Sequence, residues 1–358
     1  MTPVNVTIAV LGATGTQGRG VVAALLKTTQ ANFSVIALTR DLNSEASRSL
    51  LDRHHGDTRL SLKSANAYDF NSLLQAFEGV YGVFAVTNTR LSGQIIQDEA
   101  DMKHELIAGQ NIINAAKICQ IKHFVMSSLP SISNASNGRF SKVLHFDQKH
   151  DIEEMAQKEL PATFVHPGMS SRSGSLRNSK LTILGLFYSN LNWPQYCLTK
   201  DEDGILHFVS PLSKEKRTGW VDPSYDIGIF VAGSSPLLEC FNRLIFCQGP
   251  DKTVAKVYPV VGPQISTREM IETFEAATSR RAVAQPSTIK EWGERVSSSA
   301  GAGYREDIEQ MMEWINIAPE DKICFGTVDP EEDLSLVDLG VCASSFREWI
   351  ERTGWQGP

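Results

Sequence analysis

The chain has 358 residues, of which 42% are hydrophobic and 21% charged, a composition typical of a globular protein with one large or two modest domains. Its formal net charge of −7 argues against direct nucleic-acid binding, which depends on clustered Lys and Arg side chains. The six cysteines form no Cys-x-x-Cys motif and no apolar run approaches the ~18 residues of a membrane span, so we expect a cytoplasmic protein with reduced thiols, no metal site and no membrane partner.

A glycine-rich turn follows the first predicted strand, Val6 to Leu11. It opens a predicted helix whose first backbone N–H groups have no partner within the helix and therefore favour a diphosphate. Gly12 permits the tight turn, Gly15 lets the backbone approach a pyrophosphate, and Gly18 lets the helix pack closely on the strand. Such glycines also occur simply as punctuation between a strand and a helix. The residues of this turn that we predict to bind a dinucleotide are Gly12, Thr14, Gly15, Thr16, Gln17 and Gly18.

Apolar strands alternate with helical patterns through the first half of the chain. The clearest helical pattern runs from Asp98 to Cys119. This alternation predicts right-handed crossovers and a parallel sheet, so we expect an α/β protein with a doubly wound, parallel-sheet Rossmann fold. The strands predicted after the first one cover residues 33–38, 60–63, 80–86, 123–126 and 162–166.

The second half of the chain is less regular. Asp222-Pro223 is typical of a helix start, Ser266 to Glu269 forms a capping box, and Val257 to Val261 predicts a strand that returns to the sheet. The last third is predicted to be mostly helical, with a flexible segment from Ser297 to Gly303. We expect a dinucleotide-binding domain over residues 1–166 with a returning segment at about 217–262, and a smaller, mostly helical C-terminal substrate domain from residues 167–216 and 263–358.

The end of the second predicted strand indicates which dinucleotide is bound. An acidic residue about 20 residues beyond the glycines is typical of NAD sites, whereas arginine there accommodates the 2′-phosphate of NADP. Thr39-Arg40 occupies this place, and a guanidinium suits a phosphate, so we expect NADP(H) as the cofactor. Two alternatives remain: the adjacent Asp41 reads the ribose, or Arg40 ends the strand without any ligand.

Further motifs accompany the glycine turn and Thr39-Arg40; they are Val86 to Asn88, Lys122 to Pro130, His145 to Lys149, Leu160 to Gly168 and Trp220 to Gly228. Together they resemble the NmrA-like family of atypical short-chain dehydrogenases. The resemblance implies a Rossmann domain with a smaller domain over the cofactor, and it leaves open whether the protein catalyses or senses. It also implies cofactor contacts at Thr39, Arg40, Asn66, Thr87, Asn88, Ser127, Lys149, Pro167 and Gly168.

Lys149 matches the lysine of the Tyr-x-x-x-Lys pair of ordinary short-chain dehydrogenases, and His145 stands in place of the tyrosine. These two residues form one helical stripe with Ile152, which should face the protein interior. We therefore expect Lys149 to contact the cofactor ribose and Lys149 or His145 to donate a proton. The alternative is a solvated pair between Lys149 and Glu153 at i, i+4 beside a structural histidine.

Ser127 and Ser128 end the fifth predicted strand, where dehydrogenases of this class place a catalytic serine. Ser128 is therefore a third catalytic candidate, although serines at strand ends are also common turn residues. Tyr188, Tyr225 and Tyr304 are the candidates to replace the missing phenol, and their spacing does not choose among them.

The predicted substrate pocket departs from the family pattern, because arginine and serine stand where relatives carry aromatic residues. Its predicted residues are Arg90, Met169, Arg172 and Tyr225, and the two arginines are candidates to bind a carboxylate unless they are exposed loop residues. We expect a small-molecule tailoring oxidoreductase, or a non-redox acid–base enzyme that acts beside bound NADP. The alternative is a catalytically silent NADP(H) redox sensor, nuclear or cytoplasmic, that regulates transcription through a protein partner.

Overall fold

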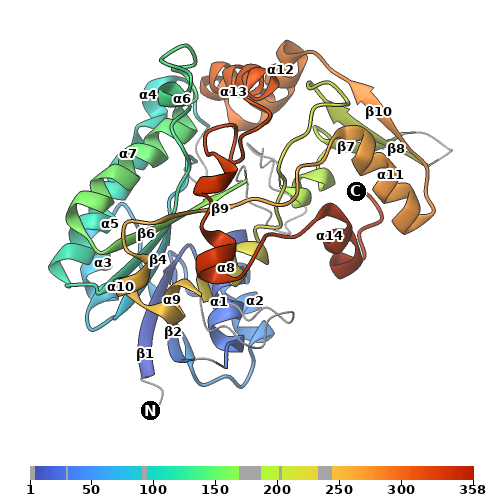
Figure 1. Ribbon diagram of the computed structural model, residues 1–358. Helices are drawn as coiled ribbons and strands as arrows, with labels where there is room; N and C mark the ends of the chain where they lie inside the picture. Colours follow the sequence, from blue (N-terminus) through green and yellow to red (C-terminus); the bar gives the residue numbers. More distant parts are fainter. Residues whose placement is uncertain (1–4, 30, 91–94, 169–186, 201–203, 233–243) are drawn as a thin grey trace.

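Two β-sheets of different size organise the chain in this computed structural model, which describes residues 5–29, 31–90, 95–168, 187–200, 204–232 and 244–358 (Figure 1). All neighbouring strands in the larger sheet are parallel. In spatial order, its seven strands are β3 (Leu60–Ser64), β2 (Asn32–Thr39), β1 (Asn5–Leu11), β4 (Gly82–Val86), β5 (His123–Ser127), β6 (Ala162–Pro167) and β9 (Val257–Val260).

The direction of winding reverses between β1 and β4. The chain proceeds from β1 outward to β3, and then returns to the other side of β1 for β4 and continues outward to β9. This is the doubly wound order of a Rossmann fold, so the predicted fold class is confirmed. In such sheets, ligands bind beyond the carboxyl ends of the strands at the reversal, which here are the ends of β1 and β4.

Helices cover both faces of the larger sheet. In β1, Ile8 and Val10 pack into the core of one face, whereas Ala9 and Leu11 pack into the core of the other. Burial on both faces requires continuous apolar strands, which made these strands visible in the sequence. One face carries α1 (Thr16–Lys27) and α8 (Asp226–Ala232), and the other carries α3 (Phe70–Phe77), α5 (His104–Ile118) and α7 (Leu144–Glu159) (Figure 1).

The smaller sheet belongs to the C-terminal part and was not predicted. Its middle strand β8 (Ile205–Ser210) pairs antiparallel with β7 (Cys197–Lys200) and parallel with β10 (Ala282–Pro286), which lies far away in the sequence. Its core holds the fully buried rings of Tyr188 and Trp292. The helices around it are α11 (Thr267–Thr278), α12 (Ile289–Ala300), α13 (Arg305–Ile317) and α14 (Phe346–Thr353), so the predicted helical C-terminal region is present.

The predicted flexible segment Ser297–Gly303 is wrong. Ser297 to Ala300 complete α12, which begins at a capping box on Thr288 and ends where Gly301 adopts φ +117°. Ala300 is buried in the C-terminal core, and a side chain on Gly301 would collide with the carbonyl of Ile96. The small residues that suggested flexibility therefore allow close packing instead.

Two predicted helices begin or continue differently from expectation. The helix predicted over Asp98–Cys119 is divided at Lys103, where the backbone N–H bonds to a carbonyl three residues back and tightens the turn. The helix predicted to start after Asp222 begins at Asp226. The Asp222 carboxylate instead closes a turn by accepting hydrogen bonds from the N–H and hydroxyl of Ser224. The other α-helices among the described residues are α2 (Glu45–Arg53), α4 (Glu99–Met102), α6 (Ile132–Ala135), α9 (Ile245–Gln248) and α10 (Pro250–Thr253).

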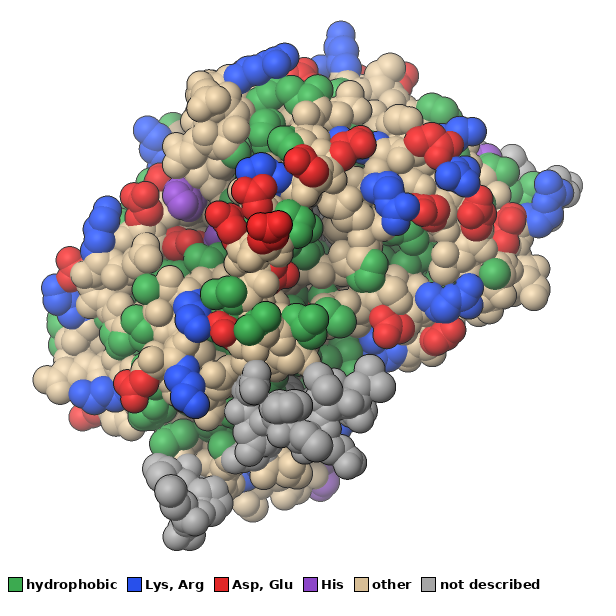
Figure 2. Space-filling view, in the orientation of Figure 1, with side chains coloured by type: hydrophobic (Ala, Val, Ile, Leu, Met, Phe, Trp, Pro, Cys, Tyr) green, Lys and Arg blue, Asp and Glu red, His purple; other side chains and the backbone are tan. Residues whose placement is uncertain are grey.

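Acidic and basic side chains are interspersed over the face of the molecule in Figure 2. That face therefore offers no continuous basic patch of the kind that binds a phosphate backbone. None of the helices in the described part of the chain is long and apolar enough to cross a membrane.

Candidate functional site

The glycine turn lies at the reversal of the sheet, directly after β1. Gly12 adopts φ +80°, and the Gly15 N–H donates to the Gly12 carbonyl at 2.8 Å. A Cβ on Gly18 would lie 2.2 Å from the Gly12 oxygen, and one on Gly12 would lie 2.8 Å from the Val86 side chain at the end of β4. Because glycine has no side chain, Gly12 and Gly18 allow the turn, α1 and β4 to pack closely together.

The first turn of α1 begins without a side-chain cap and contains no acidic residue. The N-terminal end of the helix, with the positive end of its dipole, therefore points to the carboxyl edge of the sheet, as in anion-binding helices. Thr16 and Gln17 are buried at this helix start, and Thr14 is half-buried. The turn thus fits the pyrophosphate of a dinucleotide.

The end of β2 presents Arg40 to solvent, and the ion pairs among the described residues do not include it. The carboxylate of Asp41 accepts the backbone N–H of Asn43 at 2.8 Å, so it already has a structural use. Thr39 is buried and shares a hydrogen bond of 3.1 Å with Ser47. Among the residues that the structure describes, Arg40 is therefore the charged side chain at this strand end without an ion pair. Beyond β3, the Asn66 side chain accepts the N–H of Tyr68 at 3.1 Å.

One stripe of α7 carries three ionisable side chains at a spacing of four residues, and all three are buried. The predicted inward-facing stripe is therefore confirmed, and the alternative of a solvated pair between Lys149 and Glu153 does not form. Each side chain instead lies against an ionisable side chain of another element: His145 meets Asp307 of α13, Lys149 meets Glu105 of α5, and Glu153 meets His166 of β6.

The Lys149 ammonium lies just beyond the end of β4. It donates to the carbonyl and the hydroxyl of Thr87, at 3.3 and 3.2 Å, and to the Glu105 carboxylate. All three N–H bonds therefore have an acceptor in the protein. The second oxygen of Glu105 is buried and has no hydrogen-bond partner among the described residues. A hydroxyl group of a bound molecule would satisfy that oxygen.

The contacts between His145 and Asp307 connect α7, which covers the larger sheet, to α13 near the smaller sheet. The Asp307 carboxylate accepts the backbone N–H of His145 at 3.0 Å, and its other oxygen lies 2.5 Å from the imidazole Nδ1. The second contact is a close approach of the two groups rather than an aligned hydrogen bond. Nε2 of His145 is buried without a hydrogen-bond partner among the described residues. A carboxylate that holds one imidazole nitrogen leaves the other available for proton transfer.

The two serines that end β5 are both buried. Ser128 donates its hydroxyl to the main-chain carbonyl of Lys149 at 2.9 Å, and so connects the strand end to α7. At the neighbouring strand end, Pro167 completes β6 and the Gly168 N–H donates to Val260 of β9 at 2.8 Å. These residues extend the carboxyl edge from the glycine turn across β4, β5 and β6.

The three candidate tyrosines have different surroundings. Tyr188 is stacked on Trp349, with ring centroids 5.4 Å apart, inside the C-terminal core. Tyr225 lies under the guanidinium of Arg352, 3.9 Å from its ring centroid. Tyr304 alone among the three reaches the β4 exit, where its hydroxyl donates to the carbonyl of Thr89. Burial raises the pKa of the Tyr304 phenol, so it remains neutral at physiological pH.

Arg90 follows β4 and lies over the ring of Tyr304, with its guanidinium carbon 5.5 Å from the ring centroid. Its Nη2 atom is buried without a hydrogen-bond partner, and none of the carboxylates that the structure describes pairs with it. Burial lowers the pKa of the Arg90 guanidinium, which signals an unfavourable environment for its charge. Asn88, two residues earlier, is exposed and accepts the Arg90 N–H at 3.2 Å. The predicted pocket residues Met169 and Arg172 lie outside the described residues.

Sequence reasoning missed Glu105 and Asp307. Glu105 had a visible signal, because it is the charged member of an otherwise apolar stripe that it forms with Ile112 and Ala116 on α5. Asp307 had none, since its partner His145 is brought to it only by the packing of α13 against α7.

The doubly wound sheet with a glycine turn at its reversal defines a Rossmann-fold protein. The chain belongs to the NmrA-like family, whose model matches residues 4–350. It is 34% identical over 282 residues to the NmrA-like family domain-containing oxidoreductase FrzB of a Cladobotryum species, covering 75% of this chain and 77% of that protein. It is 36% identical over 150 residues to the oxidoreductase hkm9 of Aspergillus hancockii, but this match covers only 42% of this chain and 41% of that protein.

Solved structures of NmrA, described as a negative transcriptional regulator, share the fold. The NADP complex has a TM-score of 0.65 and 22% identity, covering 98% of this chain and 92% of that one. The NAD complex has a TM-score of 0.66 and 21% identity with the same coverage. Because the same fold is seen with both dinucleotides, the fold does not choose between them.

Proposed function

We propose that this protein binds NADP(H) and reduces a small organic molecule in the tailoring of a metabolite. The observation that carries the proposal is the buried Lys149 ammonium, which stands beside the buried acceptor oxygen of Glu105 at the end of β4. Several relatives bear the name oxidoreductase, which supports a redox role. A bound NADPH would supply the hydride.

The cofactor-binding residues follow from the carboxyl edge of the sheet. The backbone N–H groups of the glycine turn hold the pyrophosphate, and the exposed Arg40 binds the 2′-phosphate. Asn66 lies on the adenine side. Thr87, Asn88, Ser127, Pro167 and Gly168 surround the nicotinamide half, and Lys149 with Glu105 orients its ribose.

His145 is the better proton donor of the two candidates. The N–H bonds of Lys149 are occupied by Thr87 and Glu105, whereas Nε2 of His145 has no partner among the described residues. Asp307 stabilises the protonated imidazole and fixes the ring. Lys149 therefore acts as a positioning residue, and Ser128 acts through the backbone of α7.

The substrate carries an anionic group that binds Arg90. A buried guanidinium nitrogen that has no partner among the described residues is costly, so an anion of the ligand would stabilise Arg90. The aromatic ring of Tyr304 packs against the Arg90 guanidinium. Met169, Arg172 and Tyr225 remain predicted members of the pocket.

The proposal is tested by incubating the full chain with NADPH and a panel of small carboxylates that carry reducible C=C, C=N or C=O bonds. We expect oxidation of NADPH coupled to a reduced product, and at least tenfold higher KM for the Arg90→Met variant with unchanged NADPH affinity. Conversion of a substrate without NADPH oxidation would establish the non-redox alternative instead.

A redox sensor is the second candidate, favoured by the similarity to NmrA, which is described as a transcriptional regulator. It predicts no turnover with any member of the panel. It also predicts that a transcription-factor partner binds differently in the presence of NADP and NADPH. This combination of results would replace the reductase proposal.

Arg40→Ala is expected to weaken NADPH binding by roughly tenfold to a hundredfold and to leave NADH binding within about twofold. The reason is the loss of charge-assisted hydrogen bonds to a phosphate that only NADPH carries, about 1.5–3 kcal/mol. Equilibrium titration with both dinucleotides measures the effect. Arg53→Ala, at the far end of α2, is the control. Equal weakening toward NADPH and NADH would contradict the role of Arg40.

A further inference from the structure

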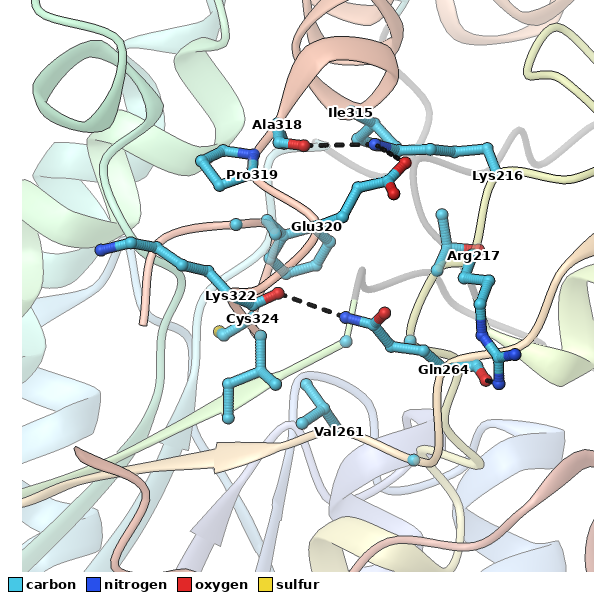
Figure 3. Close-up of a pocket in the computed structure, with 17 residues that line it drawn as sticks. Lys216, Arg217, Val261, Gln264, Ile315, Ala318, Pro319, Glu320, Lys322 and Cys324 are labelled. Carbon is cyan, nitrogen blue, oxygen red and sulfur yellow. Dashed lines mark hydrogen bonds and ion pairs between the residues drawn. The ribbon is translucent and has the colours of Figure 1, made fainter. Parts of the chain in front are cut away.

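A cavity of about 60 Å³ lies where the carboxyl edge of the larger sheet meets the C-terminal part of the chain, and we call it the seam cavity (Figure 3). Its lining comes from Gly168, which follows β6, and from three segments, residues 216–219, 261–264 and 315–326. Arg90, the proposed contact of the substrate anion, is not among the described residues that line it. The seam cavity is therefore a separate candidate site.

Hydrogen bonds hold the three segments of the seam cavity together. Thr218 and Ile265 exchange two backbone hydrogen bonds, at 3.1 and 2.9 Å, which join the first segment to the chain that follows the second. Gln264 donates its side-chain N–H to the Lys322 carbonyl at 3.2 Å, which joins the second segment to the third (Figure 3). Walls that are already ordered lose little freedom when a ligand enters, and this favours binding.

Lys216 brings a positive charge into the seam cavity. Its side chain is only 10% exposed. The ammonium donates to the Ala318 carbonyl at 3.1 Å and to the Glu320 carboxylate at 3.3 Å, and Figure 3 shows it between these two residues. An ammonium has three N–H bonds, so one of them has no acceptor among the residues that the structure describes. Lys216 can therefore bind a further acceptor.

The carboxylate that pairs with Lys216 is a weak competitor for a ligand. The Glu320 side chain is 79% exposed, so water screens its attraction to the ammonium. A carboxylate inside the seam cavity would be shielded from water and would attract the ammonium more strongly. Lys322 also lines the cavity, but its ammonium points away from Lys216 and pairs with Asp329 at 3.1 Å (Figure 3). Lys216 is therefore the cation that we expect to bind a ligand anion.

The size and the apolar lining of the seam cavity restrict the ligand. Val261, Ile315 and Pro319 provide apolar surface beside the ammonium. A cavity of about 150 Å³ binds benzene, a molecule of six heavy atoms, so a smaller ligand is required here. About 60 Å³ suits a carboxylate of roughly four heavy atoms, which is the size of acetate.

We propose that the seam cavity is a binding site for short aliphatic carboxylates. The carboxylate of the ligand takes the place of Glu320 at the Lys216 ammonium, and Glu320 turns into solvent. The alkyl end of the ligand packs against the apolar lining. Binding is independent of the proposed reductase function, because it requires neither NADPH nor Arg90.

Acetate is the probe, and saturation-transfer NMR of its methyl protons follows binding to the full chain at constant ionic strength. The titration uses the Arg90→Met chain, so that the proposed substrate contact does not contribute. We expect saturable binding with a Kd of about 1 mM, which lies within the limit for a ligand of this size. Adding Lys216→Met should weaken binding by roughly tenfold or more, because the charge is lost while the side-chain length is preserved.

Two further substitutions in the Arg90→Met chain sharpen the test. Glu320→Gln removes the competing carboxylate and should strengthen acetate binding by about threefold to tenfold. Lys322→Met, the matched control, removes another lysine of the lining and should change the Kd by less than about twofold. Circular dichroism verifies that each variant is folded.

The outcomes distinguish this site from the proposed substrate contact. Saturable binding to the native chain that is absent from folded Arg90→Met would place acetate at Arg90, and it would overturn the present proposal while supporting the reductase proposal. Binding that is unchanged by Lys216→Met, or weakened by Glu320→Gln, would also overturn it. Acetate binding that follows Lys216 in a chain without reductase activity would leave the seam cavity proposal intact.

Discussion

Replacing Lys149 by methionine is expected to abolish NADPH-dependent turnover and to lower the free energy of unfolding by about 3–5 kcal/mol. The substitution preserves the length of the side chain but leaves the Glu105 carboxylate, which is 0% exposed, without its cation. It also removes the two hydrogen bonds to Thr87 that connect α7 to the end of β4. Denaturant unfolding and NADPH oxidation measure the two effects separately.

The double variant Lys149→Met/Glu105→Leu distinguishes the structural role of the pair from its functional role. Removing both charges should recover most of the lost stability, because a buried ion pair is often replaceable by apolar groups, but turnover should remain absent. Lys117→Met is the matched control, since Lys117 pairs with Glu159 on the surface and should contribute less than about 1 kcal/mol. A stable Lys149→Met enzyme with normal turnover would exclude the proposed role.

Gly18→Ala is expected to weaken the binding of NADPH by at least a hundredfold, a loss of about 2.7 kcal/mol or more in binding free energy. The new methyl group would lie 2.2 Å from the Gly12 carbonyl oxygen, and the atoms that it meets belong to the backbone of Gly12 and Ala13. The turn or α1 must therefore move, which displaces the N–H groups that face the pyrophosphate. The same overpacking should cost about 1–3 kcal/mol of stability. Titration and thermal unfolding measure both effects.

Gly219→Ala provides the comparison for this prediction. A Cβ on Gly219 would find its nearest atoms at 3.6 Å, an ordinary contact distance, so both affinity and stability should change little. If Gly18→Ala bound NADPH as tightly as Gly219→Ala does, the glycine turn would not be the pyrophosphate site.

The larger sheet was predictable because its strands are buried on both faces and therefore appear as continuous apolar runs. The return of β9 to this sheet was also predicted correctly, as was the capping box that starts α11 at Ser266. Both signals are local. The smaller sheet escaped prediction because its strands are short and β8 pairs with a strand far away in the sequence.

Sequence alone determined the fold class, the family, the glycine turn and the inward orientation of His145 and Lys149. These properties depend on residues within a few turns of one another, whose spacing is visible in the chain. Only the tertiary structure decided the partners of the buried ionisable groups: Glu105 for Lys149, Asp307 for His145, and Glu153 for His166. A buried charge is stabilised by whichever opposite or titratable group folding brings within a few ångströms, and that proximity has no period in the sequence.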